Sequence, residues 1–158
     1  MTAISKLHVR AVRNVGDTLI HPNPGFNLLH GSNGSGKSSV LEAIHVLASG
    51  KSFRSNKLDL LVQHGAKDML VFAELASGHK FGLSKSAKTV PQLKLDGDSV
   101  KNWESIARLL PLLVLDSNTF LLADGGPQVR RSFLDWGVFH VEPGFLANWR
   151  DVKRCIAQ

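Results

Sequence analysis

The chain has 158 residues, and 43% of them are hydrophobic, which is enough for one compact domain with a buried core. Its 19 Lys and Arg residues outnumber its 13 Asp and Glu residues and give a net charge of +6, which favours a polyanionic partner such as duplex or single-stranded DNA. No run of about 18 apolar residues and no charged-then-apolar leader is present, so we expect no membrane span and a cytoplasmic location. The single cysteine cannot form an internal disulfide, and the seven histidines lack the spacing of metal ligands.

The first elements along the chain are predicted to be strands. Residues 4–12 alternate between apolar and polar side chains, which is the pattern of a half-buried strand. A turn over residues 14–17 leads to a short strand at 18–20. Two prolines and a glycine then precede an apolar run at 26–30, which we expect to form the next strand.

A glycine-rich segment follows that run and fits the pattern G-x-x-x-x-G-K-[ST]. It consists of Gly31, Ser32, Asn33, Gly34, Ser35, Gly36, Lys37 and Ser38. Its glycines let backbone N–H groups converge on an anion at the start of the next helix. Lys37 is expected to reach the β- and γ-phosphates of ATP, and the Ser38 hydroxyl to bind Mg²⁺. With the adjacent Ser39, the segment is predicted to hold the cofactors ATP and Mg²⁺.

An amphipathic helix is predicted after this loop. Residues 40–47 place apolar side chains at the i, i+3, i+4 and i+7 spacings of one helix face, and Gly50 supplies a stop signal. The basic residues Lys51, Arg54 and Lys57 come next. Lys51 and Arg54 are candidate contacts to DNA phosphates or to the nucleotide, with a solvated basic loop as the alternative.

The middle of the chain has the pattern of antiparallel hairpins. Residues 69–75 and 80–83 form one predicted strand pair, and residues 92–95 are followed by the hairpin signal Asp96-Gly97-Asp98. Antiparallel meanders therefore surround the strand-loop-helix unit. A doubly wound sheet, in which strands and helices alternate throughout, does not fit this order.

A short helix over 102–110 and a buried strand over 111–115 are expected next. That strand ends at Asp116, so one interpretation is a Walker B strand whose carboxylate reaches Mg²⁺ through water. The next residue, Ser117, is not the glutamate that ABC-type ATPases place there. The competing interpretation is a strand end that leads into a helix beginning at Pro127.

Three tryptophans, Trp103, Trp136 and Trp149, lie in apolar helical patterns. We expect them to anchor a core or an interface and not to stack on bases. Arg131 and Asp135 have the i, i+4 spacing of a surface ion pair.

The region around Pro127 carries a family resemblance. It reads Gly125-Gly126-Pro127-Gln128-Val129-Arg130-Arg131-Ser132-Phe133-Leu134-Asp135. This run resembles the signature of the RecF family of bacterial recombination mediators, and residues 138–143 continue in a similar way. Near the amino end, Val12-Arg13-Asn14 resembles the aromatic-Arg-Asn element that opens these proteins and their SMC-like relatives. The resemblance covers essentially the whole chain.

The resemblance implies an α/β fold of the P-loop NTPase class. The expected unit is the first lobe of an ABC-type ATPase head, with a mixed sheet and an antiparallel meander around the strand-loop-helix unit. It implies that Arg13 and Asn14 contact the nucleotide, although both could instead close a strand turn. Arg130 is a candidate DNA contact, and residues 116–118 fall in the Q-loop region. Relatives usually carry Pro followed by Glu or Asp where this chain has Ser117-Asn118.

The resemblance also implies a function. Proteins of this family form an ATP-dependent homodimer that binds DNA at gaps and at duplex/single-strand junctions. They act in recombinational gap repair and replication restart, and work with RecO and RecR to load RecA. The alternatives are a non-hydrolysing, ATP-switched binding module for DNA or protein, and a small P-loop kinase.

Two regions are expected within the chain. Residues 1–143 are predicted to form the ATP-binding lobe, and residues 144–158 the start of a truncated helical arm. The arm has an apolar stripe that consists of Phe145, Leu146, Trp149, Val152 and Ile156. The chain lacks a Ser-x-Gly-Gln signature and a later Walker B acidic pair, so we expect an amino-terminal fragment. Such a fragment would bind ATP weakly or not at all and hydrolyse it negligibly.

Overall fold

The computed structural model of this chain describes residues 3–55, 57–86 and 88–157. Contacts between residues divide the chain into two compact units, Met1–Leu112 and Leu113–Gln158. The expected division at residue 143, between an ATP-binding lobe and the start of a truncated helical arm, stays a prediction.

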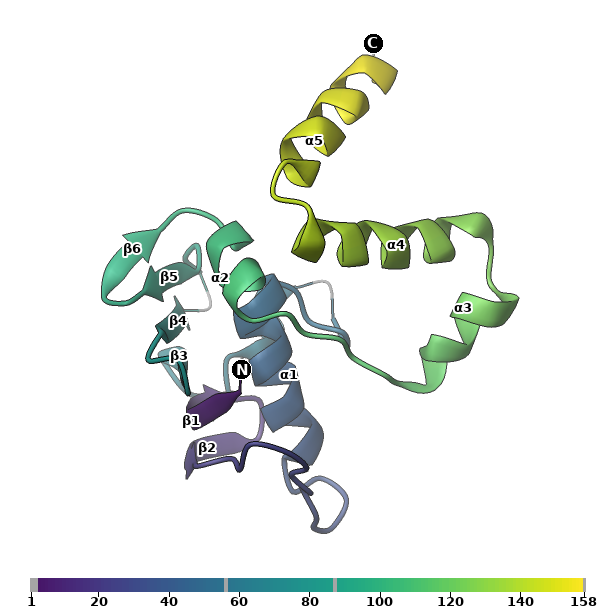
Figure 1. Ribbon diagram of the computed structural model, residues 1–158. Helices are drawn as coiled ribbons and strands as arrows, with labels where there is room; N and C mark the ends of the chain where they lie inside the picture. Colours follow the sequence, from purple (N-terminus) through teal and green to yellow (C-terminus); the bar gives the residue numbers. More distant parts are fainter. Residues whose placement is uncertain (1–2, 56, 87, 158) are drawn as a thin grey trace. The chain divides into compact units, whose positions relative to one another are not determined.

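Six strands of the first unit form one antiparallel sheet in the order β2-β1-β3-β4-β5-β6 (Figure 1). The strands are β1 (Ile4–Val12), β2 (Val15–Ile20), β3 (Asp68–Leu75), β4 (Lys80–Ser86), β5 (Gln92–Leu95) and β6 (Asp98–Val100). Every pair of neighbours in this order is consecutive in sequence except β1 and β3. One row of the register pairs His8 with Phe72, Phe72 with Gly82, and Gly82 with Lys94.

Two helices cover one face of this sheet, α1 (Lys37–Ser49) and α2 (Glu104–Leu109) (Figure 1). Strict alternation along β3 turns every second side chain toward these helices, so that Met69, Val71, Ala73 and Leu75 are buried. Helix α1 contacts β1, β3 and β4. The buried core therefore lies between the sheet and α1, and it holds α1 in place against the strands.

The end of α1 is tied to α2 by a tryptophan. Gly50 has φ 71°, and its N–H donates to Val46 O at 2.8 Å, which ends the helix. The Trp103 ring packs against Gly50, and its Nε1–H donates to Val46 O at 3.1 Å. The expectation that Trp103 anchors the core is confirmed.

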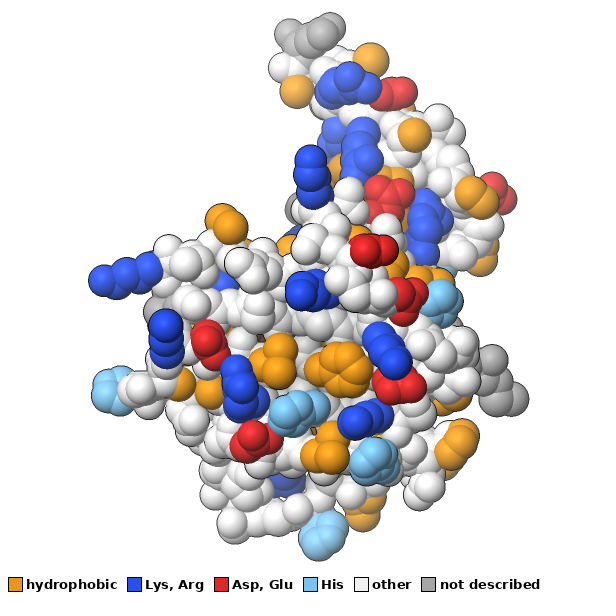
Figure 2. Space-filling view, turned by 90° about the vertical axis from the view of Figure 1, so that its left-hand side faces the viewer, with side chains coloured by type: hydrophobic (Ala, Val, Ile, Leu, Met, Phe, Trp, Pro, Cys, Tyr) orange, Lys and Arg blue, Asp and Glu red, His pale blue; other side chains and the backbone are white. Residues whose placement is uncertain are grey.

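The opposite face of the sheet combines apolar and charged side chains. Leu70 and Phe72 on β3 are half-buried there, with the exposed Arg10 and Lys94 on neighbouring strands. Arg10 Nη2 forms an ion pair with Asp68 Oδ1 at 3.1 Å. Figure 2 shows hydrophobic side chains on this face separated by basic, acidic and histidine side chains.

The second unit is helical. It contains the 3-10 helix η2 (Ser117–Phe120) and the helices α3 (Leu121–Asp124), α4 (Pro127–Val141) and α5 (Phe145–Ile156). Pro127 occupies the first turn of α4, where its missing N–H is not needed. Trp149 Nε1–H donates to Asp135 Oδ2 at 3.3 Å and so links α5 to α4. The stripe predicted on α5 is helical, and Trp149, Val152 and Ile156 of that stripe are exposed.

Several predicted elements are confirmed with small changes in their bounds. The strand over 4–12 is β1, and the hairpin signal at 96–98 joins β5 to β6. The strand predicted at 80–83 continues to Ser86, and β2 begins at Val15. The predicted turn over 14–17 is therefore wrong in length, because Val15 already pairs with Val12 and only Arg13 and Asn14 lie between the strands.

Two predicted strands are not formed. The run 26–30 is irregular, and Leu28 is 87% exposed. The run 111–115 is also irregular, and Leu115 is 72% exposed, so the prediction of a buried strand was wrong. The reason is the same for both, because a strand needs a neighbour for its backbone hydrogen bonds, and among the described residues neither run pairs with a strand. The described sheet is therefore antiparallel throughout.

Within the described ranges, every helix is too short or too polar to cross a bilayer. The same residues contain no group of three or more His, Cys, Asp or Glu side chains that could hold a metal ion.

Candidate functional site

The glycine-rich loop leads directly into α1, whose first residue is Lys37. Gly36 has φ 97°, and a Cβ at this position would lie 2.9 Å from Val15 Cγ2 on β2. Only glycine fits this turn without moving the neighbouring hairpin. Among the described residues, no side chain caps the start of α1, so its first-turn N–H groups are left to an external acceptor.

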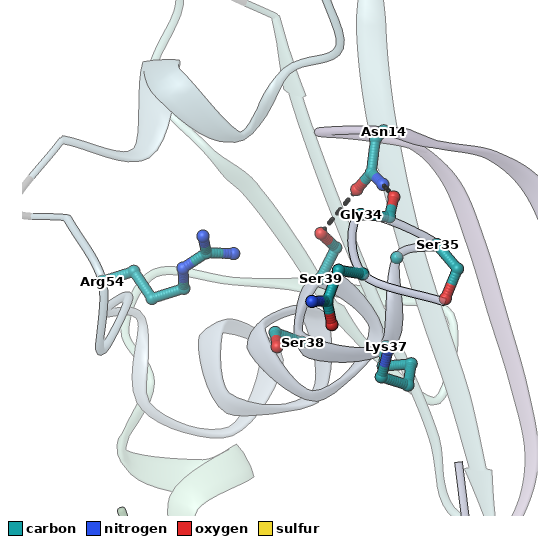
Figure 3. Close-up of a pocket in the computed structure, with 9 residues that line it drawn as sticks. Asn14, Gly34, Ser35, Lys37, Ser38, Ser39 and Arg54 are labelled. Carbon is teal, nitrogen blue, oxygen red and sulfur yellow. Dashed lines mark hydrogen bonds between the residues drawn. The ribbon is translucent and has the colours of Figure 1, made fainter. Parts of the chain in front are cut away.

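The loop forms one wall of a pocket of about 360 Å³ at the start of α1 (Figure 3). Its lining consists of Asn14, Asn33, Gly34, Ser35, Gly36, Lys37, Ser38, Ser39 and Arg54. Seven of these nine belong to the predicted nucleotide segment. The lining is mostly backbone and hydroxyl groups, with two cationic side chains, which suits a phosphate group.

Asn14 connects the pocket to the sheet. Its side-chain Nδ2–H donates to Gly34 O, and its Oδ1 accepts a hydrogen bond from Ser39 Oγ at 2.8 Å (Figure 3). The same amide therefore holds the middle of the glycine-rich loop and the first turn of α1. In this position Asn14 fixes the shape of the pocket from the β1–β2 turn.

The Lys37 ammonium lies against the loop that precedes it. Its Nζ donates to Gly31 O and to Ser32 O, both at 2.8 Å. Gly31 and Ser32 thus take part through their carbonyl groups, although they do not line the pocket. The charge of Lys37 is held at the loop where a phosphate would bind.

Arg13 does not line the pocket but forms a buried ion pair. Its Nε and Nη2 donate to the two carboxylate oxygens of Glu42 at 2.6 and 2.7 Å, and the Glu42 side chain is 0% exposed. Burial would raise the pKa of Glu42, but hydrogen bonds from Arg13 and Ser52 and the nearby positive charges hold it below its usual value. The hydrogen bond to Glu42 correspondingly raises the pKa of Arg13.

Glu42 was not among the predicted site residues. Its signal in the sequence is an acidic residue placed among the apolar positions of the helix face formed by Val40, Ala43, Val46 and Leu47. A charge in such a position is seldom buried unless it is paired.

The loop after α1 brings Arg54 to the pocket. Arg54 Nη1 lies 3.7 Å from Glu42 Oε2, and its half-exposed side chain reaches toward the start of α1 from the other side of the pocket (Figure 3). Ser52 Oγ donates to Glu42 Oε1 and accepts the N–H groups of Arg54 and Ser55, each at 2.9 Å. Ser52 is a second residue that sequence reasoning missed.

The other predicted contact residues lie elsewhere. Lys51 is exposed, and its carbonyl accepts a hydrogen bond from His45 Nδ1 at 2.6 Å. Arg130 belongs to the second unit and donates to Gly125 O at 2.9 Å, just before α4 begins. Asp116 N donates to Thr119 Oγ1 at 2.9 Å, while the side chains of Ser117 and Asn118 lie outside the described part of the chain.

Comparisons with known proteins match nearly the whole chain. The family described as RecF/RecN/SMC N terminal domain matches residues 3–119. The chain is 41% identical to the DNA replication and repair protein RecF of Pseudomonas entomophila (strain L48), and 39% identical to that of Shewanella woodyi (strain ATCC 51908 / MS32). Each alignment covers 99% of this chain and 44% of the relative, so the chain spans less than half the length of these curated relatives.

Solved structures give the same fold. A structure of the recombination mediator protein RecF with ATP in the RecFOR pathway has a TM-score of 0.79 at 23% identity, covering 97% of this chain and 43% of that one. An Smc head domain from Pyrococcus yayanosii has a TM-score of 0.73 at 21% identity, covering 98% of this chain and 36% of that one. A third structure, from work on ATP-driven dimerization and DNA-stimulated activation of SMC ATPases, has a TM-score of 0.69 at 21% identity. It covers 85% of this chain and 98% of that one.

Proposed function

The chain belongs to the RecF/RecN/SMC N-terminal domain family, and from that premise we propose that it binds ATP in a protein of DNA replication and repair. The resemblance to RecF is confirmed at about 40% identity, and the fold is that of RecF and SMC ATPase heads. ATP is the nucleotide named for a solved RecF structure with this fold, which supports the choice of ligand.

One observation carries the ATP proposal, which is the pocket at the start of α1. It combines an uncapped helix start within the described chain, glycines that admit a close approach, and an ammonium group held at the loop. The phosphates of ATP would accept from the loop N–H groups and from Lys37. Ser38 lines the pocket from the first helical turn, so its hydroxyl would supply one oxygen ligand to Mg²⁺, which offsets phosphate charge.

Arg54 is better explained as a nucleotide contact than as a DNA contact. It lines the pocket together with the glycine-rich loop, whereas Lys51 on the same loop does not. A guanidinium group presents paired donors that match phosphate oxygens. We therefore assign Arg54 to the phosphates, and leave Lys51 and Arg130 as proposed DNA contacts.

For Arg13 we propose an indirect role in place of the predicted contact to the nucleotide. Its guanidinium is committed to Glu42, so its effect on ATP would be indirect, through the β1–β2 turn that carries Asn14. Asn14 remains a proposed site residue because it lines the pocket and fixes the loop.

The ATP proposal is tested by binding of a fluorescent ATP analogue with Mg²⁺ to the 158-residue chain and to Lys37→Ala. Loss of the ammonium should weaken binding by roughly tenfold or more, because a charge-assisted contact contributes about 1.5–3 kcal/mol. Lys51→Ala is the matched control, since it removes an equal charge outside the pocket. Because the pocket is formed within this chain, we keep the expectation of weak binding over that of no binding. Equal affinity of wild type and Lys37→Ala, or no binding by the wild type, would contradict the proposal.

Hydrolysis is proposed for the longer proteins of this family and not for the chain alone. The described pocket offers phosphate contacts and a place for Mg²⁺, while in-line attack also needs a group that polarises water. Steady-state phosphate release by the chain should therefore be negligible. Robust release that Lys37→Ala abolishes would show a complete catalytic site within these residues.

A role in DNA repair follows from the relatives. We propose that the protein acts in gap repair and replication restart in the cytoplasm, binds gapped DNA, and works with RecO and RecR to load RecA. The similarity to proteins named DNA replication and repair protein RecF supports this role. Filter binding to gapped duplex should give a salt-dependent signal, and an affinity independent of salt would contradict phosphate binding.

ATP-dependent dimerisation is the remaining part of the proposal. A solved neighbour comes from work on ATP-driven dimerization of SMC ATPases, which favours a nucleotide-switched association for this fold. The same observation supports the alternative in which ATP acts as a switch without hydrolysis. Sedimentation of the chain with and without ATP-Mg²⁺ tests it, and a mass unchanged by ATP would count against a dimerisation switch.

A further inference from the structure

A hydrogen-bonded path joins the interior of α1 to the loop that carries Arg54. Glu42 is fully buried, and its Oε1 accepts hydrogen bonds from Arg13 Nη2 and from Ser52 Oγ. Ser52 Oγ in turn accepts the backbone N–H groups of Arg54 and Ser55. The backbone of Arg54 is thus attached to the helix through one hydroxyl group.

We propose that Ser52, oriented by the buried Glu42 carboxylate, is a positioning residue that sets the Arg54 guanidinium against the phosphate pocket. This inference rests on the proposed binding of ATP, and it assigns roles to two residues that touch no ligand themselves. Arg54 is the group that would meet the nucleotide, and Ser52 and Glu42 act through it.

The contacts of Glu42 differ in strength, and the difference supports this assignment. Arg13 holds the carboxylate at 2.6 and 2.7 Å, whereas Arg54 Nη1 lies 3.7 Å away. Arg54 can therefore turn to a phosphate oxygen while Arg13 and Ser52 keep the buried charge paired. Only the backbone of Arg54 is fixed by Ser52, and its side chain stays half exposed at the pocket.

A neighbouring serine gives a matched control. Ser55 lies in the same loop, but its Oγ donates to Lys57 O at 3.3 Å and accepts Lys57 N–H at 3.1 Å. Ser55→Ala therefore removes an equal hydroxyl that has no connection to Glu42. Ser52→Thr keeps the hydroxyl and tests for rescue.

The first measurement is the affinity of the 158-residue chain for a fluorescent ATP analogue with Mg²⁺. Ser52→Ala should weaken binding roughly three- to tenfold, which is the range expected when one hydrogen bond that acts indirectly on the ligand is lost. Ser52→Thr should restore the affinity to within about twofold, and Ser55→Ala should match the wild type. In an Arg54→Ala background, Ser52→Ala should have no further effect, because the residue it positions is gone.

The second measurement needs no nucleotide. Hydrogen exchange at the Arg54 and Ser55 amides should be faster in Ser52→Ala than in wild type, with amides of β3 as the internal reference. A merely structural role for Ser52 would lower stability without the coupling to Arg54.

The outcomes separate the two proposals. A wild type that does not bind the analogue overturns the proposed function, and the amide exchange still decides whether Ser52 holds the loop. Binding by the wild type that Ser52→Ala leaves unchanged overturns the positioning role alone. Additive effects of Ser52→Ala and Arg54→Ala would overturn it too, because the two residues would then act independently.

Discussion

At the scale of single residues, the buried Arg13–Glu42 pair links local stability to the pocket. Its two short hydrogen bonds are made from a residue at the β1–β2 turn to a residue in the middle of α1. A buried pair adds little net stability compared with apolar groups, but breaking it leaves an unpaired charge in the interior. The pair therefore matters most when one partner is removed.

Arg13→Ala should lower the free energy of unfolding by about 3 kcal/mol, because Glu42 then loses its main partner while it remains buried. Arg10→Ala is the matched control, since its pair with Asp68 is about half exposed on both sides and should contribute at most about 1 kcal/mol. Urea denaturation followed by circular dichroism measures both. Equal losses for the two variants would contradict the special status of the buried pair.

His45 gives the chain a dependence on pH. Burial lowers the pKa of His45 below that of a free histidine, so the folded chain favours the neutral ring. Its contribution to stability is complete above the unfolded pKa of about 6.5 and is lost as the pH falls through the lower folded pKa. The free energy of unfolding should thus decrease as the pH falls from 7 to 5. The slope should be at most that for the uptake of about one proton on unfolding.

The variant His45→Gln should remove this slope while it keeps a polar side chain beside Lys51 O. Urea titrations at several pH values give the slope for each protein. A wild-type slope that His45→Gln leaves unchanged would assign the pH dependence to other groups.

At the scale of elements, the end of α1 depends on a close contact between a glycine and a tryptophan. Gly50 has a left-handed backbone, and a Cβ there would lie 2.6 Å from Trp103 Cδ2. A side chain at this position meets both backbone strain and a ring that α2 holds in place. Gly50 therefore both ends α1 and leaves room for the Trp103 ring at the start of α2.

Gly50→Ala should cost at least about 2 kcal/mol, because the left-handed backbone penalty of about 1 kcal/mol adds to the steric conflict with Trp103. Gly97→Ala is the control, since Gly97 has φ 96° with no atom near the added Cβ. It should show the backbone penalty alone. Tryptophan fluorescence, measured with Trp136 and Trp149 replaced by Phe, reports whether the Trp103 ring moves. An equal loss of stability in the two variants would exclude a steric part.

The antiparallel hairpins and helices were predictable from the sequence, but the two apolar runs at 26–30 and 111–115 were not. Hairpins such as β5–β6 carry their partner and their turn within a few residues, so local chemistry decides them. The runs at 26–30 and 111–115 need a partner strand that the described residues do not supply. For these two runs, strand propensity alone therefore predicted a strand where the chain is irregular.

The candidate site likewise has a part that the sequence predicts and a part that only the fold reveals. The glycine-rich loop was readable because its spacing is local, whereas the network of Glu42, Ser52 and Arg54 connects residues 10–12 positions apart. Glu42, which pairs with Arg13, lies 29 positions further along the chain, so the pair could be found only from the three-dimensional structure. Arg54 was a candidate contact to DNA phosphates or to the nucleotide, with a solvated loop as the alternative, and the fold places it in the lining of the pocket.

At the scale of the molecule, the net charge belongs to one unit. The first unit holds 14 of the 19 Lys and Arg residues and 8 of the 13 Asp and Glu residues, so it carries the whole net charge of +6. The second unit has equal numbers of each sign. A proposed DNA contact at Lys51 therefore lies in a positive unit, and one at Arg130 in a neutral unit.

Lys51→Glu should lower both the affinity for gapped DNA and its salt dependence, by about one phosphate contact in the slope against salt concentration. Arg130→Glu should have a smaller effect, because the second unit has no net positive charge and the Arg130 guanidinium is engaged with Gly125 O. Filter binding at several salt concentrations measures both slopes. A larger slope change for Arg130→Glu would move the DNA contact to the second unit.

The hydrogen bonds of Lys37 have a consequence for the heat of ligand binding. The ammonium group already satisfies two loop carbonyls, so an arriving triphosphate exchanges these partners and does not meet a bare cation. The carbonyl groups of Gly31 and Ser32 then have to accept hydrogen bonds from water in place of Lys37. Calorimetry should accordingly give a less favourable binding enthalpy than the number of newly formed contacts suggests. The rest of the favourable free energy should come from the entropy of released water and counterions.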